Sequence, residues 1–101
     1  MEDNGTLVRQ IFSLMNACNR AYIKQGKQPR PLPNVAIINS LNADMLLSYR
    51  AYMIYLIKKL DPLFKLSTVG ISAASLGKNA KTYVPINNLP LMWPPEENNS
   101  A

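Results

Sequence analysis

The sequence predicts an all-α protein with a small three-helix core, a proline-rich connector and an extended proline-rich C-terminal arm. Two long segments support this class, because their apolar residues recur at spacings of three and four, the period of a helix with one buried side. Neither segment contains proline, whereas most of the chain's prolines fall in the connector and the arm. A chain of 101 residues suits one domain. We expect a helical domain over residues 1–79 and the arm over residues 80–101.

The first helix is expected over residues 5–24. Asp3, Asn4 or Thr6 can cap its start by accepting hydrogen bonds from free backbone N–H groups, and Gly26 suits its end. The expected buried side holds Val8, Ile11, Phe12, Met15, Cys18 and Tyr22.

Residues 25–34 are expected to be extended, because Pro29, Pro31 and Pro33 each remove a backbone donor and restrict the preceding residue. Residues 35–41 form too short a run to distinguish a strand from a helical turn. Both alternatives are open at this point.

The second helix is expected over residues 42–60, with Asn42 or Asp44 as its cap. Apolar residues lie on nearly every side, so we expect it to be buried on several sides. A membrane span is not expected, because Arg50 interrupts the apolar run and a span needs about twenty apolar residues. Arg50 itself needs an internal carboxylate, helix-end carbonyls or a phosphate, or else its guanidinium reaches the surface past Tyr49 or Tyr52.

A third helix is expected over residues 62–76. Asp61 can act as its cap, Pro62 suits its first position, and Gly77 marks its end. Several Gly, Ser and Thr residues make this the weakest of the three patterns.

The charge is unevenly distributed along the chain. The whole sequence carries +5, but between residues 4 and 95 only Asp44 and Asp61 oppose eleven Lys and Arg, giving 11 − 2 = +9. Such a body attracts nucleic acid, anionic lipid or an acidic protein surface, although cations near helix ends also balance the helix dipole. The candidate contacts to an anionic partner are Arg20, Lys24, Lys27, Arg30, Arg50, Lys58 and Lys59.

The arm contains an apolar group flanked by prolines. Tyr83, Leu91, Met92 and Trp93 are the expected anchors, and a lone Trp among prolines typically packs into a groove. The groove belongs either to this chain's own core or to a neighbouring subunit, and the sequence leaves both alternatives open.

The sequence lacks the usual residues of catalysis. It has no His and one Cys, which predicts no enzyme, no cofactor and no metal site. We expect Cys18 to be a buried, unreactive thiol. The single cysteine and the acidic start, which lacks a signal peptide pattern, together predict an intracellular, reducing compartment or a virion.

A short resemblance concerns residues 41–77. Leu41-Asn42, the run from Ser48 to Tyr52, Pro62 and Gly70 resemble the opening of the fungal mating-type alpha-box, a relative of the HMG box. The resemblance implies a small basic regulator that binds the DNA minor groove. The Trp that the family carries further along the chain does not follow here, and Gly77 stands where that part of the family pattern would begin.

The pattern as a whole favours a non-enzymatic structural or assembly subunit of a larger complex or virus particle. Its expected partners are protein subunits, either further copies of this chain or other proteins. A nucleic-acid-binding regulator is the alternative.

Overall fold

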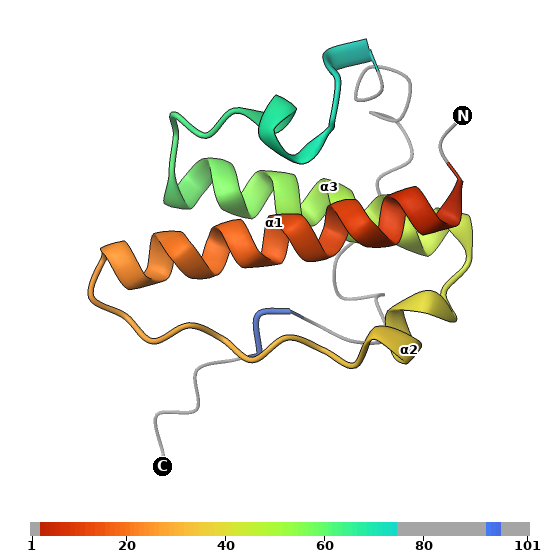
Figure 1. The fold of residues 1–101 in the computed structure, drawn as a ribbon, viewed down its shortest axis with the longest axis horizontal. Helices are drawn as coiled ribbons and strands as arrows, with labels where there is room; N and C mark the ends of the chain where they lie inside the picture. Colours follow the sequence, from red (N-terminus) through yellow and green to blue (C-terminus); the bar gives the residue numbers. More distant parts are fainter. Residues whose placement is uncertain (1–2, 75–92, 96–101) are drawn as a thin grey trace.

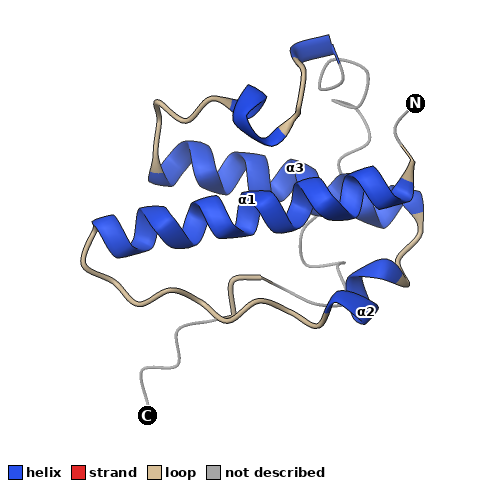
Figure 2. Cartoon of the chain, viewed as in Figure 1, coloured by secondary structure: helices blue, strands red, loops and turns tan. Residues whose placement is uncertain are grey.

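The computed structural model describes residues 3–74 and 93–95, and in these ranges the protein is all-α (Figures 1 and 2). Its helices are α1 (Asn4–Lys24), α2 (Val35–Asn39) and α3 (Ala43–Leu60), followed by the short 3-10 helix η1 (Leu66–Val69). The predicted fold class is confirmed. Residues 35–41, for which strand and helix were both open, contain the short helix α2.

α1 and α3 pack side by side and run in the same direction (Figure 1). Their C-terminal ends lie close together, since the side-chain Nε2 of Gln25 donates a hydrogen bond to the Leu60 carbonyl oxygen at 3.3 Å. The connector, residues 25–42, therefore runs back along the helix pair before α3 begins, and it includes α2.

The helix starts follow the predicted caps. The Asp3 carboxylate accepts the backbone N–H of Thr6 at 2.8 Å, and the Asn42 side chain accepts that of Met45 at 2.9 Å. Each cap satisfies a donor that has no partner inside its helix.

α1 ends in a Schellman motif built on Gly26, whose φ is 80°. The Gly26 N–H bonds to the Ile23 carbonyl, and the Lys27 N–H bonds to that of Tyr22 at 2.9 Å. Glycine suits this position because a side chain disfavours positive φ.

The helix predicted over residues 62–76 does not form as one element, and this expectation was wrong. The Asp61 carboxylate accepts the Leu63 N–H in a local turn, and the only helical segment up to Val69 is η1. Gly70, with φ 77°, then ends η1, and the Ile71 N–H bonds back to Leu66. A left-handed glycine inside the predicted span therefore stops the helix early.

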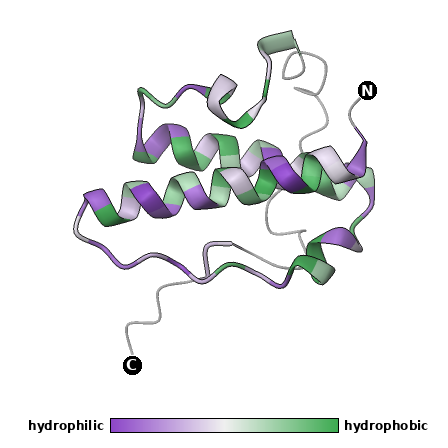
Figure 3. Ribbon diagram, viewed as in Figure 1, coloured by the Kyte–Doolittle hydropathy of each residue, from purple (hydrophilic) through white to green (hydrophobic). Residues whose placement is uncertain are grey.

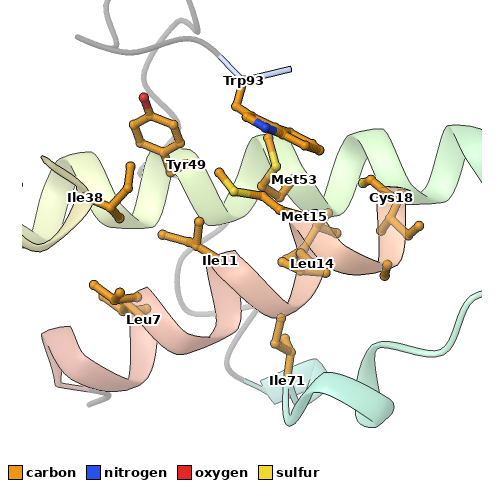
Figure 4. Close-up of a cluster of buried hydrophobic side chains, with 14 of the residues drawn as sticks. Leu7, Ile11, Leu14, Met15, Cys18, Ile38, Tyr49, Met53, Ile71 and Trp93 are labelled. Carbon is orange, nitrogen blue, oxygen red and sulfur yellow. The ribbon is translucent and has the colours of Figure 1, made fainter. Parts of the chain in front are cut away.

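The core lies between α1 and α3 and is covered on two sides. Both long helices alternate hydrophobic and hydrophilic residues, as expected when one side is buried (Figure 3). Ile38 of α2, Ile71 and Trp93 add buried side chains from outside the pair (Figure 4). In α1 the predicted buried side is confirmed except at Phe12, which is partly buried.

Within the described helices, none has both the length and the hydropathy needed to cross a bilayer. The predicted boundary between residues 79 and 80 lies outside the described ranges, as does most of the predicted arm.

Candidate functional site

The parallel packing of α1 and α3 gathers positive charge at one end of the helix pair. Both helices finish there, and basic residues occupy their last turns and the segments that follow. Of the described acids, Asp61 lies at this end, whereas Asp3 and Asp44 lie at the helix starts. We call this surface the basic end, and it comprises Arg20, Lys24, Lys27, Arg30, Lys58, Lys59 and Lys65.

Most cations of the basic end are exposed, and Arg30 is half-buried. Lys58 donates a hydrogen bond to the Phe64 carbonyl at 3.2 Å, which places it towards the segment after α3. Arg30 is held on the connector side, where its backbone N–H donates to the Asn19 side chain at 2.7 Å. The basic end therefore has two flanks with different surroundings.

Two cations of the basic end lie over aromatic rings. The Arg30 guanidinium carbon lies 4.6 Å from the Tyr22 ring centre, and the Lys59 ammonium lies 5.3 Å from that of Tyr55. The rings of Tyr52 and Tyr55 are 6.1 Å apart. Burial raises the pKa of Tyr52, and the nearby Tyr22 and Tyr55 hydroxyls act in the same direction. We call these five residues the tyrosine strip.

Arg50 does not belong to this surface. Its side chain is 1% exposed, and its Nη1 donates to Gln10 Oε1 at 2.6 Å. Gln10 in turn donates from Nε2 to the Gly70 carbonyl at 3.1 Å. The alternative in which Arg50 reaches solvent past Tyr49 or Tyr52 was wrong, because the guanidinium lies between α1 and α3.

Trp93 lies in the chain's own core. It is 2% exposed, its indole lies beside Met15 and Met53, and its Nε1 donates to the Pro31 carbonyl at 2.8 Å (Figure 4). The structure thus shows the own-core alternative for this anchor. Tyr83, Leu91 and Met92, the other predicted anchors, lie outside the described residues.

Cys18 is buried as expected. Burial raises the pKa of its thiol to about 12, because a thiolate would lose its hydration there. A thiol with this pKa is a poor nucleophile at neutral pH.

Sequence reasoning missed three residues. The spacing of Gln10 was a usable signal, since this polar residue lies three positions after Leu7 and four before Leu14 and so falls on the apolar side of α1. Lys65 joins the basic end only because the chain turns back after α3. Tyr55 was not singled out, although Lys59 four positions later was a signal for the contact between the two.

Comparison with protein-family models, with curated proteins and with solved structures gives no match. None of these comparisons supports the resemblance of residues 41–77 to the alpha-box. In residues 3–74 and 93–95, no three His, Cys, Asp or Glu side chains gather as a metal site would require.

Proposed function

We propose that this protein is a non-enzymatic subunit of a larger assembly and that its basic end binds an anionic partner. The observation that carries the proposal is the shared end of α1 and α3, where the basic residues of four chain segments converge and Asp61 is the one described acid. Converging cations raise the local concentration of an anion and speed its association.

Two further observations support the proposal. The first is the number of exposed cations. Part of their charge stabilises the fold, because the two helix dipoles direct their negative ends towards this surface. The seven cations of the basic end carry more charge than the dipoles of α1 and α3 balance, and most of them are exposed to solvent.

The second observation is a group of exposed apolar side chains. Leu32, Val35 and Ile37 lie close together in the chain, which suits a subunit that contacts other proteins.

The experiment measures the salt concentration at which the full chain leaves immobilised heparin, a polyanion without bases. Lys24→Gln is compared with Arg9→Gln, because both remove one exposed cation from α1, at its end and near its start respectively. We expect Lys24→Gln to lower the eluting salt concentration and Arg9→Gln to leave it nearly unchanged. Equal effects of the two variants, or no retention of the wild type at low salt, would contradict the proposal.

A further inference from the structure

The tyrosine strip shares Arg30 and Lys59 with the basic end and adds aromatic rings to them. Tyr55 is 56% exposed, although it is an aromatic residue on a helix whose other large side chains are mostly buried. Its hydroxyl accepts a hydrogen bond from Lys59 Nζ at 3.3 Å, so a cation is fixed at its edge. Surface charge alone explains neither the exposed ring nor its pairing with Tyr52.

The strip alternates two kinds of group. Arg30 lies over the Tyr22 ring, Lys59 lies over the Tyr55 ring, and the Tyr52 ring packs beside that of Tyr55. Tyr52, Tyr55 and Lys59 lie three and four positions apart, so they share one side of α3. Rings and cations are thus presented together rather than on separate faces.

We propose that the tyrosine strip binds single-stranded nucleic acid, with bases stacking at Tyr55 and Tyr52 and phosphates meeting Lys59 and Arg30. Unpaired bases expose faces that stack on aromatic rings, and the backbone between them carries the charge that cations need. A duplex hides its base faces, and an acidic peptide has no comparable flat group. The inference rests on the proposed function, because the basic end supplies the general attraction for the phosphate chain.

The experiment measures anisotropy of a labelled single-stranded oligonucleotide with the full chain at low salt. Tyr55→Ala is the test variant, Tyr55→Phe keeps the ring, and Lys65→Gln removes a cation of the basic end outside the strip. We expect Tyr55→Ala to weaken binding roughly tenfold and Tyr55→Phe to bind nearly as the wild type does. Lys65→Gln should weaken it by less than Tyr55→Ala. The matching duplex should bind more weakly than the single strand.

Heparin separates this inference from the proposed function. Tyr55→Ala should keep its affinity for heparin, because stacking is not involved there. If Tyr55→Ala binds the oligonucleotide as tightly as the wild type, or if the duplex binds equally well, the strip is not a stacking surface and the basic end is a general polyanion site. If the wild type binds neither heparin nor the oligonucleotide, both proposals fail.

Discussion

At the residue scale, a charged side chain lies inside the helical core at position 50. Arg50 gives up hydration to be there, and the Gln10 oxygen replaces part of it at 2.6 Å. Gln10 also binds the Gly70 carbonyl, so a single amide links α1, α3 and the segment after η1. The arginine that interrupts an apolar helix is explained by this link.

The first prediction removes either side of the Arg50–Gln10 bond. Arg50→Met leaves the Gln10 oxygen buried without this donor, and Gln10→Leu deprives a buried guanidinium of an acceptor. Each should lower the free energy of unfolding by about 2–4 kcal/mol, whereas the double variant should lose less than the sum. Urea denaturation of the four proteins measures the coupling. Strictly additive losses would show that the two side chains act independently.

At the element scale, two glycines decide where helical segments end. Gly26 and Gly70 have φ values of 80° and 77°, and an added Cβ at either site would touch nothing within 4 Å. The cost of a side chain there is therefore backbone strain alone.

The second prediction follows from this strain. Gly26→Ala and Gly70→Ala should each destabilise the protein by about 1 kcal/mol. Gly5→Ala is the control, because Gly5 lies within α1 and its added Cβ would meet Asp3 at an ordinary 3.6 Å. Thermal melting should show lower midpoints for the first two variants and no loss for the third. A stable Gly70→Ala protein would mean that residues 70 and 71 readily adopt another turn.

An element was predictable from the sequence when the contacts that form it are local, and was missed when they come from distant parts of the chain. The caps Asp3 and Asn42 act within one turn, so the sequence pattern locates the starts of α1 and α3. The end of η1 was missed, because Gly70 can sit in a helix or end one, and the choice depends on the packing of Ile71 and the bond from Gln10. In the tyrosine strip, the contact of Arg30 with Tyr22 was not predictable, because it forms only when the connector folds back on α1. The spacing of Tyr52, Tyr55 and Lys59 on one helix was a usable signal that was missed.

At the scale of the whole molecule, Trp93 connects the C-terminal region to the helix pair. Its indole packs on Met15 and Met53, and its Nε1–H donates a hydrogen bond to the Pro31 carbonyl of the connector. A single side chain therefore contacts three parts of the chain that are far apart in sequence. The sequence identified Trp93 as an anchor but could not tell which surface receives it, since Pro31 carries no signal for an acceptor.

The third prediction concerns Trp93→Ala. Loss of the buried indole should lower the stability of the isolated chain by about 3–5 kcal/mol, equally at every protein concentration. Trp93→Phe keeps most of the apolar volume but loses the hydrogen bond, so its loss should be smaller. Chemical denaturation followed by circular dichroism measures both variants. A wild-type stability that rises with concentration, and a variant that melts like the dilute wild type, would instead place Trp93 at a contact between copies.

The parallel direction of α1 and α3 also means that the chain must cross the length of the pair before α3 can pack on α1. Gln10 and Arg50 are separated by 40 positions, and Gln10 and Gly70 by 60, so the bonds that join the elements require closure of long loops. Closing such loops slows folding, and two antiparallel helices joined by a short turn would fold with shorter loops. During synthesis α1 emerges first, and its apolar side is left without α3 until the connector and the second long helix have been made. The newly made chain therefore passes through a stage at which Ile11, Leu14 and Met15 are open to water or to a chaperone.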